Sequence, residues 1–209
     1  MLIFPEQKLV FFAIPKTGST AYQQLLMNNV DLAFQSTSDR KHMNVRQFER
    51  RMVPSLGRGL AGRLQRFAVM RHPLERMRSW YRYRTRLPVT AHRSTAGISF
   101  TKFIEAYLSD EPPEFAALGD QWLFVKTADD LVGIDHLFAI ERPALLKSFL
   151  ADRFGTLPDS ARTNVSPEAS TDLGADLTSA LRAAHEREYA LYDMLMEEGG
   201  YLHSPRPRD

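Results

Sequence analysis

Three runs of mostly apolar residues stand out along the chain, at residues 9–14, 67–70 and 133–140. Each run ends abruptly and is followed by a segment with apolar residues at helical spacing. Parallel strands are covered by helices on both faces of a sheet, so they read as continuous apolar runs instead of alternating ones. The pattern therefore predicts an α/β fold, a three-layer domain with a central parallel sheet of four or five strands.

Helical spacing predicts helices between and after these runs. The first is expected over residues 21–29, and the final one runs without interruption over 177–195. Proline suits the first turn of a helix, and asparagine or serine suits the cap before it. By these signals four further helices are expected to begin, after Asn44, at Pro73, after Ser99 and at Pro143.

The composition indicates one globular domain. The 209 residues are 44% hydrophobic and 25% charged, which is ordinary for a chain with a sizeable core. We expect a single domain over residues 1–203 and a disordered tail at 204–209. Cysteine is absent, which excludes disulfides and thiolate metal sites and suits a reducing compartment. No stretch reaches the roughly 20 apolar residues of a membrane span, and no signal peptide is recognisable, so we expect a cytoplasmic protein.

Charge is distributed unevenly along the chain. Residues 40–93 contain 15 Lys or Arg and two acids, whereas the rest contains 12 basic and 23 acidic residues. This asymmetry predicts a face that attracts an anion, whether a nucleotide, an acidic substrate or nucleic acid. Residues 82–97 are rich in Arg, Thr and Pro and are expected to form a loop over the site. Four arginines of this segment are candidates for binding an acidic acceptor, Arg82, Arg84, Arg86 and Arg93.

The first apolar run passes directly into the turn PKTGST at residues 15–20. A helix start has backbone N–H groups without intrahelical partners and the positive end of the helix dipole, so it attracts a phosphate. Lys16 adds a full charge, and Gly18 lets the backbone approach the phosphate oxygens closely. Hydroxyl donors are added by Thr17, Ser19 and Thr20.

A histidine lies just before the next expected helix. Asn44 and Gln47 have the spacing of a capping box, which places His42 ahead of the helix N-terminus. Positive potential at this position disfavours the imidazolium, so the ring is expected to stay neutral and able to accept a proton. His42 is therefore a candidate general base.

The second apolar run is followed by a second charged turn and helix. Arg71 comes at the carboxyl end of the expected strand, Pro73 begins the helix, and Ser79 lies about two turns into it. Ligands of open parallel sheets bind outside the carboxyl ends of the strands. Residues 15–20 and the turn at Arg71 are thus both expected at the edge of the sheet where a ligand would bind.

In both segments the chain resembles sulfotransferases that use 3′-phosphoadenosine 5′-phosphosulfate (PAPS). Residues 15–20 are similar to the loop that binds the 5′-phosphosulfate in this family, and the spacing of Arg71 and Ser79 is similar to the family's 3′-phosphate motif. His42 lies where glycosaminoglycan-type members carry their catalytic histidine. Asn164 and Ser166 lie where relatives have an Asn and a Ser near the nucleotide. The resemblance implies the P-loop-like sulfotransferase fold.

The resemblance also implies a reaction and its residues. A sulfuryl group would move from PAPS to an acceptor hydroxyl, of a saccharide, leaving 3′-phosphoadenosine 5′-phosphate (PAP). Lys16 and His42 would be the catalytic residues, and no metal is expected because no metal-ligand spacing appears in the sequence. The cofactor-binding residues would be Lys16, Thr17, Gly18, Ser19, Thr20, Arg71 and Ser79. We expect no nucleic-acid partner.

Two other functions are compatible with the pattern. An ATP-dependent small-molecule kinase could share the fold, but ATP loops place the lysine after the glycines, whereas Lys16 precedes Gly18. A non-catalytic module that binds polyanions or nucleic acid would use the basic segment 40–93, and its affinity would depend steeply on salt.

Overall fold

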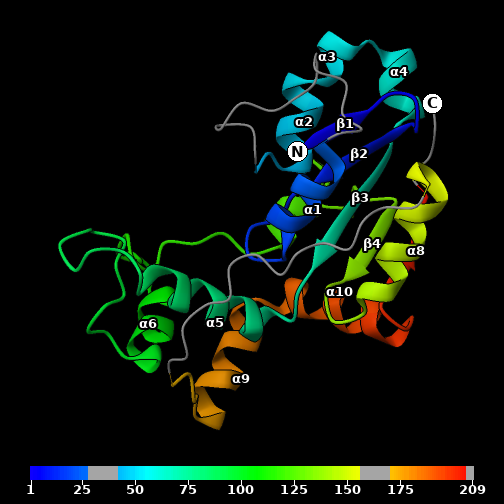
Figure 1. Ribbon diagram of the computed structural model, residues 1–209. Coiled ribbons are helices and arrows are strands. Elements are labelled where there is room, and N and C mark those ends of the chain that lie inside the picture. Colours follow the sequence, from blue (N-terminus) through cyan, green and yellow to red (C-terminus); the bar gives the residue numbers. More distant parts are fainter. Residues whose placement is uncertain (28–41, 156–169, 206–209) are drawn as a thin grey trace. The chain divides into compact units, whose positions relative to one another are not determined.

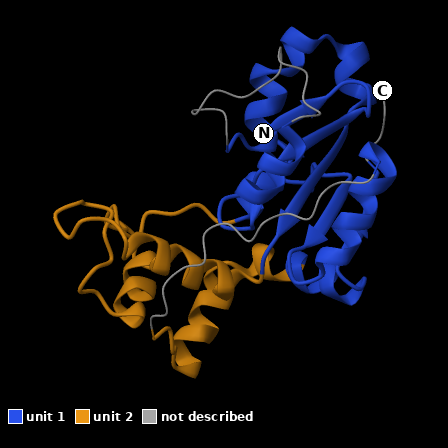
Figure 2. Ribbon diagram, in the orientation of Figure 1, with its two compact units in different colours: residues 1–71, 121–163, 191–209 blue, residues 72–120, 164–190 orange. Residues whose placement is uncertain are grey.

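The computed structural model describes residues 1–27, 42–155 and 170–205 (Figure 1). The predicted nucleotide neighbours Asn164 and Ser166 lie outside these ranges, as do residues 206–209 of the expected tail. The chain divides into two compact units, which Figure 2 colours separately. Unit 1 comprises residues 1–71, 121–163 and 191–209, and unit 2 comprises residues 72–120 and 164–190.

Unit 1 contains a five-stranded sheet in the order β1-β2-β3-β4-β5. The three central strands are parallel, as the apolar runs predict, and pair in the register Phe11↔Phe67 and Phe67↔His136. Both edge strands run antiparallel to their neighbours and were not predicted. The strands are β1 Leu2–Phe4, β2 Leu9–Phe12, β3 Gln65–Met70, β4 His136–Ala139 and β5 Tyr201–His203.

Helices cover both faces of this sheet, which makes unit 1 three-layered as expected. Side chains of each strand alternate between the two faces: Phe11 joins a core with α1 (Ser19–Leu26) and α8 (Pro143–Phe154), whereas Phe12 joins a core on the opposite face. That opposite core receives side chains from α2 (Val45–Arg51), α3 (Val53–Leu56), α4 (Arg58–Arg63), α7 (Trp122–Val125) and the end of α10 (Glu186–Glu197). Helices on both faces explain why the central strands are apolar throughout.

Unit 2 is helical and has its own apolar core. Its helices are α5 (Pro73–Arg84), α6 (Phe100–Tyr107), α9 (Ala175–Ala184) and the first turn of α10. Phe103 and Ile104 of α6 are fully buried in this core, together with Leu181 of α9. As expected, Pro73 lies in the first turn of α5, and the Ser99 side chain caps α6 by accepting a hydrogen bond from the Lys102 N–H.

The expected continuous helix over 177–195 is wrong. It breaks at His185, whose φ of −120° and ψ of 38° end α9 before α10 begins. Near the C-terminus, residues up to His203 form strand β5, and the Ser204 N–H then donates to the Asp135 carbonyl. No helix in the described ranges is both long and apolar enough to cross a membrane.

Candidate functional site

The loop between β2 and α1 has an unusual backbone. Lys16 has a φ of 70° and Gly18 a φ of 72°, both in the left-handed region, and Thr17 between them does not. Left-handed φ is costly for any residue with a Cβ, so Lys16 is held there by the surrounding loop. Alternation of this kind turns successive backbone N–H groups toward one side and forms an anion-binding concavity. The backbone thus adds donors to the charge of Lys16.

Close packing around Gly18 and Thr17 keeps the β2–α1 loop in place. A Cβ on Gly18 would lie 3.1 Å from the Ile140 side chain, just after β4, so only glycine fits without displacement. The Thr17 side chain is fully buried, and its hydroxyl donates to the Ile14 carbonyl at 2.9 Å. This hydrogen bond stabilises the loop, and the predicted role of Thr17 in binding the cofactor stays a prediction.

Helix α1 begins immediately after Gly18, with Ser19 and Thr20 in its first turn. No side chain caps this N-terminus, so its first N–H groups and the helix dipole are directed at the loop. Ser19 is nearly buried and Thr20 is half-buried. The strand, the glycine turn and the helix start follow one another as the sequence predicts.

His42 lies beside the end of the same strand. Its Nδ1 is 2.8 Å from the carbonyl oxygen of Ala13, which follows β2. A carbonyl oxygen only accepts hydrogen bonds, so Nδ1 carries a proton, and in the neutral form of the ring the lone pair is on Nε2. The structure therefore brings His42 to the segment that leads into Lys16, although 25 positions separate them in the sequence.

The capping box predicted at the start of α2 is confirmed. The Asn44 side chain accepts a hydrogen bond from the Gln47 N–H at 2.8 Å, and the Gln47 side chain accepts one from the Asn44 N–H at 3.1 Å. These reciprocal bonds fix where the helix begins. They also fix the backbone two residues after His42.

Arg71 follows β3 directly and is held by a residue that the sequence did not indicate. The side chain of Gln121, fully buried, accepts a hydrogen bond from the Arg71 N–H at 3.0 Å and donates one to the Arg71 carbonyl at 2.8 Å. Both main-chain groups of Arg71 are thus satisfied by one amide. Gln121 sets the backbone from which the arginine side chain extends.

Ser79 lies in the middle of α5, within unit 2, and is 9% exposed. Arg71 is the last residue of the preceding segment of unit 1. The assignment of both residues to one phosphate therefore stays a prediction from their spacing in the sequence.

Two of the candidate acceptor arginines, Arg82 and Arg84, make hydrogen bonds within unit 2. Helix α5 extends to Arg84, so the loop expected from residue 82 begins only after it. Arg84 is buried: its guanidinium donates to the Glu114 carbonyl at 2.9 Å and lies 5.2 Å from the centre of the Trp80 ring. Burial lowers the pKa of Arg84. Arg82 donates to the Thr171 hydroxyl at 3.1 Å.

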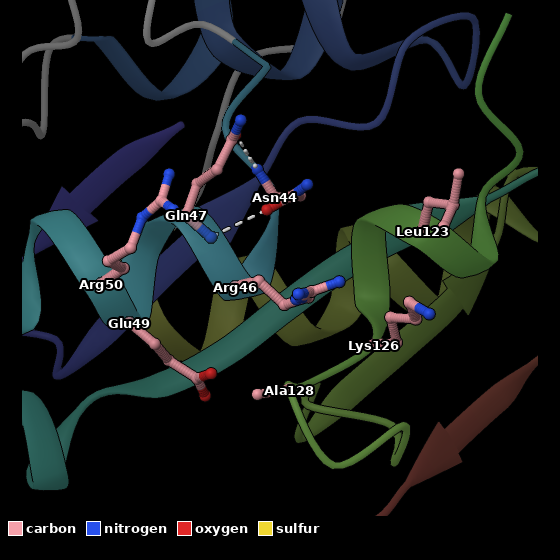
Figure 3. A pocket seen from close by; sticks show the side chains of 8 residues that line it. All are labelled: Asn44, Arg46, Gln47, Glu49, Arg50, Leu123, Lys126 and Ala128. Atoms are coloured by element: carbon pink, nitrogen blue, oxygen red, sulfur yellow. Dashed lines mark hydrogen bonds between the residues drawn. The ribbon is translucent and has the colours of Figure 1, made fainter.

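A cavity of about 570 Å³ opens between α2 and the end of α7 (Figure 3). Both residues of the capping box line it, which places its edge two residues from His42. Its remaining lining is mostly charged, with Arg46, Glu49, Arg50, Leu123, Lys126 and Ala128. The sequence did not predict this cavity, because α2 and α7 are far apart in the sequence and come together only in the folded protein.

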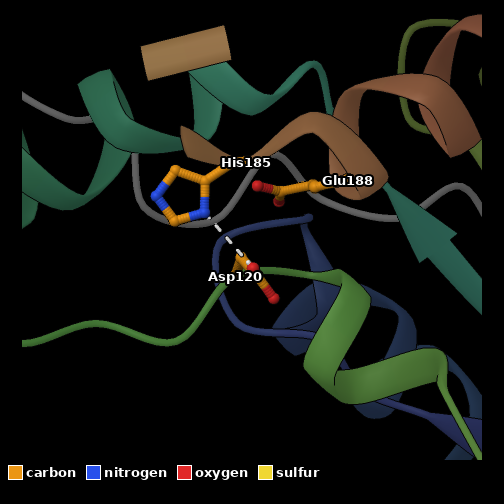
Figure 4. A group of neighbouring side chains, drawn as sticks. All are labelled: Asp120, His185 and Glu188. Atoms are coloured by element: carbon orange, nitrogen blue, oxygen red, sulfur yellow. Dashed lines mark hydrogen bonds and ion pairs between the residues drawn. The ribbon is translucent and has the colours of Figure 1, made fainter. Parts of the chain in front are cut away.

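Unit 2 groups three side chains of types that bind metals, Asp120, His185 and Glu188 (Figure 4). His185 Nδ1 lies 3.2 Å from the Asp120 carboxylate. The guanidinium of Arg76, 2% exposed, lies 3.9 Å from Glu188, and burial lowers its pKa while Glu188 opposes this shift. The buried guanidinium of Arg76 already supplies positive charge beside these carboxylates. The group is therefore better explained as an ionic network within unit 2 than as a metal site.

Comparison with known proteins identifies the family. A search of curated proteins and a search of solved structures each found no match. A family model described as "Sulfotransferase family" matches residues 1–186, which include the β2–α1 loop, His42, Arg71 and Ser79. The match covers most of the chain, and the α/β sheet agrees with it. The chain belongs to the sulfotransferase family.

Proposed function

We propose that this sulfotransferase moves a sulfuryl group from PAPS to a hydroxyl of a saccharide. The observation that carries the proposal is the hydrogen bond from His42 to the Ala13 carbonyl, because it joins a candidate base to the strand that leads into the anion-binding loop. Further support comes from the left-handed φ angles of Lys16 and Gly18, which give this loop a backbone suited to phosphate oxygens.

The chain's own residues divide the binding of the nucleotide between them. N–H groups of residues 18–20 hold the 5′-phosphate, with the Ser19 and Thr20 hydroxyls as further donors. Lys16 neutralises the charge that develops on the departing phosphate oxygen. Arg71 and Ser79 bind the 3′-phosphate. PAPS supplies the activated sulfuryl group, and the scheme needs no metal.

His42 is the general base that removes the proton of the acceptor hydroxyl. Nδ1 keeps its proton on the Ala13 carbonyl, so Nε2 takes the proton of the acceptor hydroxyl as that oxygen bonds to sulfur. The bond between sulfur and the phosphate oxygen breaks, and its electron pair leaves with PAP. Positioning and charge stabilisation supply the remaining catalysis, as in phosphoryl transfer.

Calorimetry with PAP and with ATP tests the nucleotide. We expect PAP to bind tightly and ATP weakly, and we expect Arg71→Ala to weaken PAP binding about tenfold or more, as loss of a charged hydrogen bond does. Tight ATP binding without a response to PAP would instead identify a kinase. Steep salt dependence with no effect of Lys16→Ala would identify a polyanion-binding module.

Transfer of label from PAPS to a panel of acceptors tests the second substrate. Saccharide, phenol, steroid and lipid acceptors should be compared at equal concentration. We expect turnover with the saccharides, and turnover with phenols or steroids alone would contradict the saccharide assignment.

A further inference from the structure

We infer that the cavity between α2 and α7 is an acceptor subsite that binds a negatively charged group of the saccharide, a carboxylate or a sulfate ester, through Arg46 and Lys126. This inference rests on the proposed function, because it assigns the acceptor to the side of unit 1 that carries His42.

Most of the charged side chains that line the cavity are positive. Its one acidic residue, Glu49, is already neutralised, because its carboxylate lies 2.7 Å from the Arg66 guanidinium. Lys126 is paired with Asp130 at 2.7 Å. Arg46 and Arg50, both exposed, form no ion pair with any residue in the described ranges. The cavity therefore keeps an excess of positive charge.

Arg46 comes from α2 and Lys126 from the end of α7, on the two sides of the cavity. Arg46 extends from α2 toward the end of α7, where Lys126 lies, whereas Arg50 extends away from that helix (Figure 3). A guanidinium presents parallel donors that match the two oxygens of a carboxylate or of a sulfate ester. An anion between α2 and α7 would meet Arg46 from one side and, from the other, the ammonium of Lys126, which has three N–H donors and uses one of them for Asp130.

The cavity begins close to His42. Asn44 lines the cavity and is two residues after His42, so their Cα atoms lie within about 7 Å. A sugar ring is of similar size. A saccharide whose hydroxyl reaches His42 would thus place a neighbouring residue of its chain over the cavity. The volume of about 570 Å³ is adequate for one charged sugar unit.

Three tetrasaccharides of equal length test the subsite by calorimetry in the presence of saturating PAP. A hyaluronan tetrasaccharide carries carboxylates, a keratan-type tetrasaccharide carries sulfate esters without carboxylates, and a chitin tetrasaccharide carries neither. We expect at least one acidic probe to bind more tightly than the neutral probe. We also expect Arg46→Ala and Lys126→Ala each to weaken that binding about tenfold.

Arg51→Ala is the matched control, because Arg51 is exposed on the same helix and does not line the cavity. It should leave the affinity for the acidic probe unchanged. In turnover assays Arg46→Ala should raise KM for the acidic acceptor and leave kcat nearly unchanged. Equal binding of all three probes, or equal losses in Arg46→Ala and Arg51→Ala, would overturn the subsite.

PAP binding separates this inference from the proposed function. All the variants should bind PAP as the parent protein does, since none of the changed residues belongs to the nucleotide loop. If the parent protein fails to bind PAP, the proposed function is wrong. If PAP binds and the acidic probes show no dependence on Arg46, only the subsite is wrong.

Discussion

The imidazole of His42 donates a hydrogen bond of 2.8 Å from Nδ1 to the main-chain carbonyl of Ala13. This bond fixes both the tautomer and the orientation of the ring, so that a base role falls to Nε2. We predict that His42→Ala lowers turnover by roughly 100-fold to 10,000-fold, the usual contribution of a general base. PAP affinity should stay nearly the same. The exposed His92 provides the control, and normal turnover of His42→Ala would remove His42 from the mechanism.

Lys16 has both a charged side chain and a strained, left-handed backbone. Substitution by glycine removes the charge and relieves the strain, so the two effects can be measured separately. Lys16→Gly removes the amine but relieves a left-handed φ that costs a side-chain-bearing residue about 1–2 kcal/mol. We expect turnover to fall by at least about 100-fold while the free energy of unfolding stays equal or rises by about 1 kcal/mol. Lys8→Gly is the matched control, because Lys8 has a φ of 55° in an exposed turn. Retained turnover in Lys16→Gly would exclude a catalytic amine.

Gly18 and Gly155 share a positive φ, of 72° and 78°, but differ in their surroundings. A Cβ at Gly18 would lie 3.1 Å from Ile140, whereas one at Gly155 would meet no atom within 4 Å. Each alanine variant should lose roughly 1–3 kcal/mol of stability through backbone strain, since Gly18 has a ψ of 6° in the left-handed helical region and Gly155 a ψ of −167° in a region that is essentially restricted to glycine. Gly18→Ala alone should lose PAP affinity, measured by calorimetry. Equal PAP affinity in both variants would show that the loop does not approach the phosphate.

Gln121 forms two hydrogen bonds to the main chain of Arg71. We predict that these bonds position the Arg71 side chain for the nucleotide. Gln121→Leu removes both of these hydrogen bonds to the main chain of Arg71, and we expect PAP affinity to fall about tenfold. In an Arg71→Ala background the same change should have little further effect on PAP affinity, because the side chain that Gln121 positions is already absent. Additive losses in the double variant would contradict this positioning role.

The free energy of unfolding should depend on pH through His136. Burial and the nearby His203 lower the pKa of His136 from its ordinary 6.5 to about 4. The unfolded chain therefore takes up this proton first, so stability is complete above about pH 6.5 and falls as the pH drops toward 4. Urea unfolding at pH 7 and pH 5 should show a smaller difference for His136→Phe than for the parent protein. His92→Phe, at an exposed position, should behave as the parent does.

The central strands and the turns after them could be predicted because their signals are local. An apolar run followed by a lysine, a glycine and a helix start is complete within residues 9–20, and the capping box at Asn44 is complete within four residues. Each structure forms from neighbours in the chain, so the pattern contains what is needed. The same holds for α8 between Pro143 and Phe154.

Other features depend on partners distant in the sequence. Gln121 reads as an ordinary polar residue until the fold brings it to Arg71, 50 positions earlier. The break at His185 is invisible to helical periodicity, since apolar residues keep their spacing across it. The bond from His42 to Ala13 likewise requires the tertiary fold, although the position of His42 before a helix was predictable.

Strand β5 also determines the order in which unit 1 can be completed during synthesis. It pairs with β4 along Leu137↔Leu202, yet the ribosome makes it only after α8, α9 and α10. Until then β4, an apolar strand, has one row of backbone groups open to any other extended chain. A nascent chain that has already formed the nucleotide loop and displays His42 is thus still exposed to pairing with a neighbouring molecule. A chain that ended before Tyr201 would therefore be aggregation-prone although its proposed catalytic residues are all present.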